Sequence, residues 1–452
     1  MAEKKIKTYY DVVCPFCGSL CDDLEVDVEI KSDKVVEVRN ACQIGTHIYY
    51  STNPNNKHRY KKPLIRKNGK LEEVSWEEAL DKSAEYLANS KRALLYGWSS
   101  TEAGAISKGV ELAELIGGVL DNCSSICHGP SIMAIQDVGI VGSTLGEYRN
   151  RADLVIFWGC NPVHAHPRHL GRYSSFNRGY FRKDGRNDRF MVVVDPRRTH
   201  TAQLADLYIQ INPNEDYELF SAIRALLRGV ELDLEYVSGV PIEKVIELVN
   251  RMKSCKYGVI FFGLGLTHTI SHHRNVDNAI CLVRELNEYT KFLIQPMRGH
   301  YNVAGSNIVF SWGTGYPLAV DFSRGYPRYN PGEFSALSIL LKDEIDVSMV
   351  VASDPILNLP KAAVKNMLKH PLISVELHET PTSALADIVL PVKIVGVECE
   401  GTAYRMDNVP IRLRKVKNGP ENLLTDKEIM EKLIQKVTQK KYPAQIEISI
   451  AR

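Results

Sequence analysis

Residues 154–162 read LVIFWGCNP, an apolar run that ends in glycine, cysteine, asparagine and proline. A continuous apolar run of this length predicts a strand buried on both faces, which is typical of a parallel sheet covered by helices. An apolar run, then turn residues, then a helical pattern recurs from about residue 60 onward, with further runs at 93–96, 190–194, 259–262, 292–294, 348–351 and 372–375. The sequence therefore predicts an α/β protein with doubly wound parallel sheets.

Polar turn residues follow several of these predicted strands. Open parallel sheets bind ligands at the carboxyl ends of their strands, so we expect these residues along one crevice, where a nucleotide would lie. Any single one is most simply part of an ordinary turn, but five such turns together favour a large, dinucleotide-like ligand. The residues are Gly97 and Ser99, Gly159 with Asn161 and Pro162, Asp195 with Pro196 and Arg197, Gly263 with Gly265, and Ser353 with Asp354 and Pro355.

The length and charge of the chain exclude several classes of protein. Its 452 residues predict about three domains of ~150 residues each. With 56 lysines and arginines against 54 aspartates and glutamates, the chain lacks the uncompensated positive charge of a nucleic-acid-binding protein. No stretch approaches the ~20 apolar residues of a membrane span and no apolar leader follows the first lysines, so we expect a cytoplasmic protein.

Four of the ten cysteines fall within the first 42 residues, as Cys14, Cys17, Cys21 and Cys42. The spacing C-x2-C-x3-C-x20-C lets three thiolates cover one face of a [4Fe-4S] cluster while the distant fourth closes it. Structural zinc, which usually shows paired C-x2-C hooks, and unliganded thiols are the alternatives. Residues 1–60 therefore predict a small β-rich cluster domain, with short antiparallel strands at 9–13, 24–30 and 34–38.

A second cysteine motif, NCSSICHGPS, spans residues 122–131. Its small residues would let a ligand approach the backbone closely. Cys127 beside His128 is compatible with a nucleophile and its base, a redox disulfide with Cys123, a soft ligand for a transition metal, or a small buried residue. The pattern leaves these alternatives open.

Two further motifs follow predicted strands. The histidines in HAHPRH, at positions 164, 166 and 169, are compatible with zinc, but Pro167 interrupts any helix and no carboxylate lies nearby, which favours contact with a ligand or another subunit. In QPMRGH, residues 295–300, Arg298 stands at a strand end. There its guanidinium could clamp a carboxylate, although a surface arginine fits equally well.

With these motifs the chain resembles the molybdenum/tungsten bis-pterin oxidoreductases, the formate dehydrogenase and DMSO reductase superfamily. The narrower motifs CHGPS at 127–131 and RGHYN at 298–302 are similar to the formylmethanofuran dehydrogenase family of methanogenic archaea. The superfamily matches run in chain order: the four N-terminal cysteines, WGxNP at 158–162, DPRxT at 195–199, SDP at 353–355, and ADIVLP at 386–391 with Glu398, Gly401 and Thr402.

The resemblance implies a bis-molybdopterin guanine dinucleotide cofactor carrying W or Mo, with Cys127 as metal ligand, His128 and Arg298 beside it, and one [4Fe-4S] cluster. It implies three domains: 1–60 for the cluster, 61–130 with 290–452, and an inserted 131–289. The residues expected at the pterin cofactor are Gly159, Asn161, Pro162, Asp195, Arg197, Thr199, Asp216, Gly263, Gly265, Asp354, Glu398, Gly401 and Thr402.

The implied activity is reduction of CO2 to formate, with electrons from ferredoxin or polyferredoxin subunits. Formate would pass to an amidohydrolase-type zinc subunit, which formylates methanofuran. The superfamily's C-terminal β-barrel is expected to be absent and supplied by a small partner subunit, because only fifty residues follow Thr402, and residues 423–437 predict a helix. A stand-alone formate dehydrogenase subunit, a non-catalytic scaffold and a zinc hydrolase are the alternatives.

Two departures from the superfamily pattern concern electron transfer and guanine binding. Ile44 stands where many members carry a lysine between cluster and pterin, which leaves Gln43 or His47 as polar substitutes. In the turn at 211–216, INPNED, only Asp216 of the guanine-contacting pattern is retained.

Overall fold

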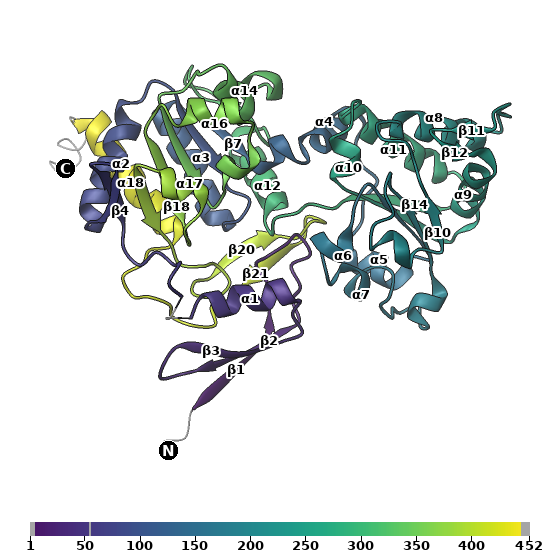
Figure 1. The fold of residues 1–452 in the computed structure, drawn as a ribbon, viewed down its shortest axis with the longest axis horizontal. Helices are drawn as coiled ribbons and strands as arrows, with labels where there is room; N and C mark the ends of the chain where they lie inside the picture. Colours follow the sequence, from purple (N-terminus) through teal and green to yellow (C-terminus); the bar gives the residue numbers. More distant parts are fainter. Residues whose placement is uncertain (1–4, 54–55, 444–452) are drawn as a thin grey trace, which may run out of the picture.

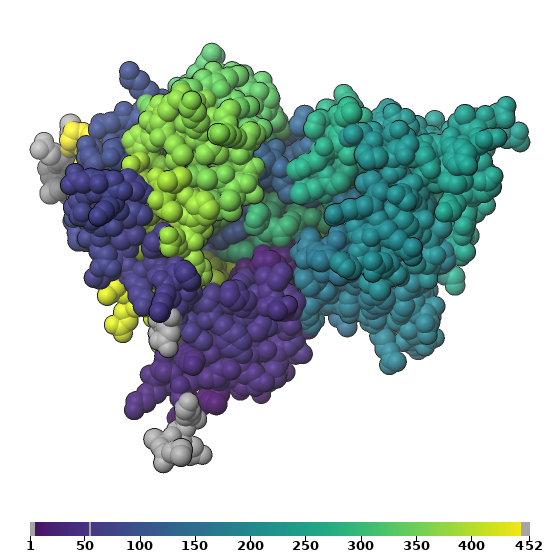
Figure 2. All heavy atoms as spheres, viewed as in Figure 1, coloured from purple at the N-terminus to yellow at the C-terminus, as the bar shows by residue number. Residues whose placement is uncertain are grey.

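A computed structural model describes residues 5–53 and 56–443 of the chain. Two α/β units stand beside each other, and a small β-rich unit formed by the N-terminal residues lies below and between them (Figure 1). The space-filling view shows a cleft between the two larger units, with the N-terminal unit at its lower end (Figure 2). Among the described residues, no helix is both long enough and apolar enough to cross a membrane.

The N-terminal unit is a three-stranded antiparallel sheet with one helix. Strands β1 (Ile6–Val12), β2 (Leu24–Glu29) and β3 (Lys34–Arg39) pair in chain order, and α1 (Gln43–Ser51) follows. Alternate residues of β2, Leu24, Val26 and Val28, are buried, as expected for a sheet with one covered face. The three predicted antiparallel strands are therefore present: the first begins three residues earlier than predicted, and the other two match the prediction to within one residue.

The unit that contains LVIFW is a five-stranded parallel sheet in the order β10-β9-β8-β13-β14. Alternate residues of β8 pack on opposite faces: Ile156 against α8, α9 and α11, and Phe157 against α5 and α7. Helices thus cover both faces, as the continuous apolar runs predict. The strands are β8 (Leu154–Trp158), β9 (Phe190–Val194), β10 (Leu207–Ile209), β13 (Tyr257–Phe262) and β14 (Lys291–Pro296); the helices are α5 (Leu145–Arg151), α7 (His169–Arg172), α8 (Asp216–Leu227), α9 (Ile242–Ser254) and α11 (His273–Leu286).

The other α/β unit has a nine-stranded sheet that is parallel only in its centre. The five central strands β7, β6, β17, β18 and β19 are parallel, whereas β15 and β4 pair antiparallel to them at the two sides. The expectation of purely parallel sheets is wrong at these edges, because the local hairpins 64–73 and 320–329 extend the sheet. The strands are β4 (Leu64–Lys67), β5 (Lys70–Glu73), β6 (Ala93–Gly97), β7 (Val119–Asn122), β15 (Val320–Asp321), β16 (Arg328–Tyr329), β17 (Val347–Val351), β18 (Leu372–Glu376) and β19 (Ile388–Pro391).

Helices cover both faces of this sheet as well. On one face α2, α3, α12 and α18 pack against Leu95 and Met349; on the other α4, α14 and α16 pack against Leu94 and Val350. These helices are α2 (Trp76–Asn89), α3 (Ala103–Ile116), α4 (Gly129–Val138), α12 (Val303–Thr314), α14 (Ala336–Leu341), α16 (Lys361–Met367) and α18 (Asp426–Lys441). Thr425 and Glu428 form a capping box at the start of α18, so the helix predicted at 423–437 begins at Asp426 instead.

The chain passes twice between the two α/β units, through residues 139–144 and 297–302. The predicted domain boundary at 289/290 falls just before β14, which pairs with β13 in the five-stranded sheet. The remaining short elements are η1 (Cys123–Ile126), α6 (Pro162–Ala165), η2 (Gly185–Asp188), η3 (Ala202–Leu204), β11 (Tyr236–Val237), β12 (Val240–Pro241), α10 (Leu264–Thr267), α13 (Pro331–Phe334), α15 (Pro355–Asn358), α17 (Pro381–Leu385), β20 (Gly401–Tyr404) and β21 (Pro410–Leu413).

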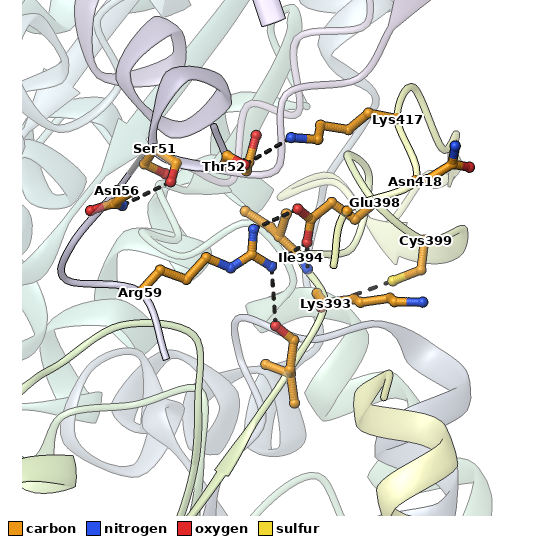
Figure 3. A network of polar contacts seen from close by, with 12 residues as sticks. Ser51, Thr52, Asn56, Arg59, Lys393, Ile394, Glu398, Cys399, Lys417 and Asn418 are labelled. Atoms are coloured by element: carbon orange, nitrogen blue, oxygen red, sulfur yellow. Dashed lines mark hydrogen bonds and ion pairs between the residues drawn. The ribbon is translucent and has the colours of Figure 1, made fainter. Parts of the chain in front are cut away.

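A buried ion pair joins the segment after α1 to the segment after β19 (Figure 3). The Arg59 guanidinium donates to both carboxylate oxygens of Glu398, with 2.5 Å between Nη1 and Oε1, and the two side chains are 3% and 0% exposed. Glu398 also accepts from the Ile394 N–H, and nearby the Lys417 Nζ donates to the Thr52 carbonyl oxygen at 2.8 Å. These contacts fix the entry of the chain from the N-terminal unit into the nine-stranded sheet.

We predict that Arg59→Met lowers the free energy of unfolding by about 3–5 kcal/mol, because Glu398 is then buried without its counter-charge. The matched control is Arg412→Met, which removes an exposed pair with Glu400 and should cost less than about 1 kcal/mol. Urea denaturation followed by tryptophan fluorescence measures both. Equal losses in the two variants would contradict a dominant contribution from burial.

Candidate active site

The four N-terminal cysteines converge on one small cavity. Cys14, Cys17 and Cys21 come from the loop between β1 and β2, and Cys42 caps the N-terminus of α1, accepting from the Gly45 N–H at 3.4 Å. A Cβ at position 45 would lie 3.0 Å from the Cys14 Sγ and 3.6 Å from the Cys42 Sγ. Glycine at this position therefore leaves room for the two sulfurs to face the same point.

The environment of these thiols is suited to a bound cationic centre. Burial, followed by the charges of the other three cysteines, raises the pKa of Cys14, so four thiolates require a cationic centre to hold them together. Four thiolates around one cavity can hold a tetrahedral metal ion or an iron–sulfur cluster.

Cys127 and Arg298 follow η1 and β14, and they lie close enough for each to influence the pKa of the other. Burial raises the pKa of Cys127 to about 12, while the charge of Arg298 acts in the opposite direction. Arg298 is only 6% exposed, and among the described residues its guanidinium has neither a hydrogen bond nor an ion pair. Burial lowers its pKa to about 10, which leaves it charged at neutral pH. A buried and unpaired guanidinium is costly, so this geometry favours an anionic ligand between the two residues.

His128 is fully buried next to Cys127. Its Nδ1 lies 2.9 Å from the Ser131 Oγ and its Nε2 lies 3.2 Å from the carbonyl oxygen of Met297. Burial, with a smaller effect from Arg298, lowers the pKa of His128 to about 3, so the ring is neutral. Because a carbonyl oxygen only accepts, Nε2 carries the proton and Nδ1 accepts from Ser131. The residue thus connects η1 to the strand end that carries Arg298.

The cluster loop and the Arg298 loop touch through their backbones. The Gly18 N–H donates to the Gly299 carbonyl oxygen at 2.9 Å, and the Met406 N–H donates to the Gly18 carbonyl oxygen at 2.9 Å. A Cβ at position 18 would overlap the carbonyl oxygen of Arg298. That oxygen also accepts a hydrogen bond from the His166 Nε2 at 2.8 Å. The cysteine cavity and Arg298 are therefore held next to each other.

The sequence did not single out Gly18, and it left the role of His166 open. The only signal for Gly18 is its place inside CPFCGSLC, between two cluster cysteines. The histidines of HAHPRH do not form a zinc site, because each has a different partner. His164 pairs with His200 at 2.7 Å, His166 with the Arg298 carbonyl and His169 with the Ser174 Oγ at 3.1 Å.

The ten cysteines are free, so Cys123 and Cys127 do not form the disulfide that was one interpretation of their spacing. The Cys123 Sγ instead lies 3.4 Å from the Ser353 Oγ and 3.6 Å from the Gly97 carbonyl oxygen. The thiol thus fills the space between the ends of β6 and β17.

The glycines expected at the cofactor lie at one crevice edge, where β8 and β13 end. Gly159 has a positive φ of 56°, and a Cβ there would lie 2.9 Å from the Gly265 Cα. The Gly265 N–H donates to the Gly159 carbonyl oxygen at 2.9 Å, and a Cβ on Gly263 would lie 2.6 Å from that of Cys160. The two strand ends can approach this closely only because side chains are absent.

Polar residues from the same unit complete this edge. The Asn161 Oδ1 accepts from the Thr201 hydroxyl at 2.6 Å, and Asp195 accepts from the N–H of Arg197, whose side chain is exposed. Asp216, at the start of α8, accepts from the Trp158 Nε1 at 2.7 Å, and burial raises its pKa to about 6. Pro162 begins α6 and is buried, and the Thr199 Oγ1 accepts from the Ala202 N–H at 3.1 Å.

The remaining expected residues belong to the nine-stranded unit and its β20–β21 hairpin. The Asp354 Oδ1 accepts from the Thr382 N–H and hydroxyl, and Thr402 pairs with Arg412 across the hairpin. A Cβ on Gly401 would lie 2.6 Å from the Glu102 side chain, so this strand is packed tightly against the start of α3. Both carboxylate oxygens of Glu398 are engaged by Arg59, which leaves this residue a structural partner.

A cavity of about 640 Å3 leads from the surface to Arg298. Its wall is mostly apolar, and Trp312, which is 71% exposed, stands at the wall with its ring against that of Tyr404. Gln295, Asn307 and Arg298 supply polar groups. The cavity is large enough for a small molecule to reach Arg298.

Comparisons with known proteins show the family to which the chain belongs. The molybdopterin oxidoreductase family matches residues 59–436. The chain is 53% identical over 434 residues to the B subunit of the tungsten-containing formylmethanofuran dehydrogenase 2 of Methanocaldococcus jannaschii, over 96% of this chain and 99% of that relative. It is 51% identical over 438 residues to the protein of the same name from Methanococcus maripaludis, over 96% of this chain and 100% of that one.

Two solved structures share the fold. A chain of the formyltransferase/hydrolase complex of Methylorubrum extorquens, solved with methylofuran, superposes with a TM-score of 0.67 at 19% identity, over 84% of this chain and 99% of that one. Acetylene hydratase of Pelobacter acetylenicus superposes with a TM-score of 0.70 at 14% identity, over 96% of this chain but 70% of its own. The chain belongs to the molybdopterin oxidoreductase family and, within it, to the formylmethanofuran dehydrogenase B subunits.

Proposed function

We propose that this chain is the catalytic subunit of a formylmethanofuran dehydrogenase and reduces CO2 to formate. The observation that carries the proposal is the buried, unpaired Arg298 guanidinium, whose charge acts on the Cys127 thiol. A fixed positive charge without a protein partner is suited to an anionic substrate. A soft thiolate beside it is suited to W or Mo. The tungsten in the name of the similar M. jannaschii protein supports tungsten for this chain.

The crevice residues suit a bis-molybdopterin guanine dinucleotide cofactor. The tight glycine edge at 159 and 265 would admit a phosphate or pterin close to the backbone, and Asp216 would meet a guanine. Cys127 would hold the metal, and the bound group would supply two-electron redox chemistry beside Arg298. The four N-terminal cysteines would hold one [4Fe-4S] cluster.

Arg298 and His128 have different roles in this proposal. Arg298 holds the two oxygens of formate through its planar fork and stabilises the negative charge that develops as CO2 is reduced. His128, a candidate for handling a proton because of its place beside Cys127, is neutral and bonded at both nitrogens. We therefore assign it to positioning: it keeps the Met297 carbonyl, and with it Arg298, at a fixed distance from Cys127.

The cavity beside Arg298 would admit CO2, which is small and apolar, through its mostly apolar wall. Formate would leave for an amidohydrolase-type zinc subunit that formylates methanofuran, and ferredoxin-type subunits would deliver electrons. In this proposal a small partner subunit closes the pterin site with a β-barrel.

Two other functions remain testable against this one. A stand-alone formate dehydrogenase subunit would use the same site without methanofuran. A non-catalytic scaffold is the second alternative, because the fold is shared with the formyltransferase/hydrolase complex. Against it, Cys127, His128, Arg298 and the four N-terminal cysteines are all present in this chain. Metal and pterin analysis of the purified complex, with assays for formate and for methanofuran formylation, separates the three. If the purified complex contains no W, Mo or pterin, the non-catalytic scaffold is the function that remains.

We predict that Cys127→Ala removes W or Mo from the purified complex while the cluster remains, because no other thiol would replace the lost ligand. Elemental analysis should show metal content reduced at least tenfold, with the iron content and the cluster EPR signal unchanged. The matched control is Cys281→Ala, within α11. Full metal content and formate turnover in the Cys127 variant would refute its role as ligand.

We predict that Arg298→Lys lowers kcat/KM for formate by roughly a hundredfold, because an ammonium cannot engage both carboxylate oxygens in one plane. Metal content and the cluster signal should stay at the wild-type level. Arg412→Lys on β21 serves as the control, since Arg412 is exposed. Unchanged kinetics in Arg298→Lys would count against the carboxylate clamp.

A further inference from the structure

His300 stands where the cluster loop meets the active-site loop. Its backbone forms an antiparallel bridge with Cys17, one of the four cysteines of the cluster cavity. The adjacent contact between Gly18 and Gly299 keeps the two segments in register at 2.9 Å. Only Gly299 separates His300 from Arg298. His300 therefore lies next to Cys17 of the cluster cavity and close in sequence to Arg298 of the proposed substrate site.

The imidazole of His300 has no hydrogen-bond partner within the described part of the chain. The other two histidines near Arg298 are engaged: His128 with Ser131 and Met297, and His166 with the Arg298 carbonyl oxygen. His300 is exposed to solvent, so its ring is accessible to a bound ligand. In its neutral form an imidazole presents one donor and one acceptor to such a ligand.

The other residues considered between cluster and pterin lie on α1, and they lack the connections to Cys17 and to the Arg298 loop that His300 has. Ile44 is apolar and 38% exposed, so it offers no hydrogen bond. Gln43 and His47 are exposed on α1, and His47 lies close enough to His378 to influence the pKa of that residue. No backbone hydrogen bond or bridge in the described residues joins α1 to the loop of Arg298.

Resting on the proposed function, we propose that His300 is a positioning residue that hydrogen-bonds the pterin ring nearest the cluster and holds it against the cluster cavity. The pterin ring edge carries nitrogen and oxygen atoms that match the donor and acceptor of imidazole. Because the reduction potential of a cluster depends on hydrogen bonds and solvent around it, His300 also sets the environment through which the two centres are coupled.

The test compares His300→Ala with His300→Gln in the purified complex. Glutamine keeps a donor and an acceptor, whereas alanine keeps neither. We expect His300→Ala to slow the reduction of the cluster by formate at least tenfold in freeze-quench EPR, and to shift the midpoint potential of the cluster. In His300→Gln the rate should return to within about threefold of wild type. His370→Ala, a surface histidine beside Asp343, is the control.

Iron, tungsten and pterin contents are measured in the same samples. Loss of pterin in the alanine variant with retention in the glutamine variant also supports the contact. Loss of the cluster in both variants would overturn it, because His300 would then only support the cysteine loop. An alanine variant with the wild-type rate and potential would overturn this inference alone, whereas a wild-type complex without pterin would overturn the proposed function with it.

Discussion

The backbone contact between Gly18 and the Arg298–Gly299 loop is the constraint on which the site depends. It joins a loop from the N-terminal sheet to the carboxyl end of β14, which belongs to another unit of the fold. Two further parts of the chain contact these loops. The Met406 N–H donates to the Gly18 carbonyl oxygen, and the His166 Nε2 donates to the Arg298 carbonyl oxygen. Four separate parts of the chain therefore determine where the cysteine cavity stands relative to the guanidinium.

Two buried arginines show how the same side chain serves stability and function. The Arg59 guanidinium donates hydrogen bonds to both carboxylate oxygens of Glu398, and the pair holds distant segments of the chain together. Arg298 is equally buried but has no counter-charge among the described residues. The first arrangement contributes specificity to the fold. The second leaves a buried charge without a partner, which is why our proposal places a ligand beside Arg298.

Much of the fold could be predicted because its signals are local. LVIFW predicts a strand buried on both faces, and the cysteine spacing predicts a cluster loop, without knowledge of the partners. The antiparallel edges were missed because their strands are too short for a periodic pattern: β15 and β16 have two residues each, and β4 and β5 have four. The pairing of Glu398 with Arg59 spans 339 positions, and the neutral state of His128 depends on its burial in the folded protein, so neither follows from a local pattern. The tertiary fold alone creates these contacts.

The close approach at Gly18 has a consequence for the gene as well as for the protein. Every missense change in a glycine codon introduces a Cβ, and at this position a Cβ overlaps the Arg298 carbonyl oxygen whichever amino acid carries it. The codon thus has no conservative replacement, although it encodes the smallest residue and contributes no chemical group. Variation among natural sequences should avoid this position as strictly as it avoids the cysteines on either side.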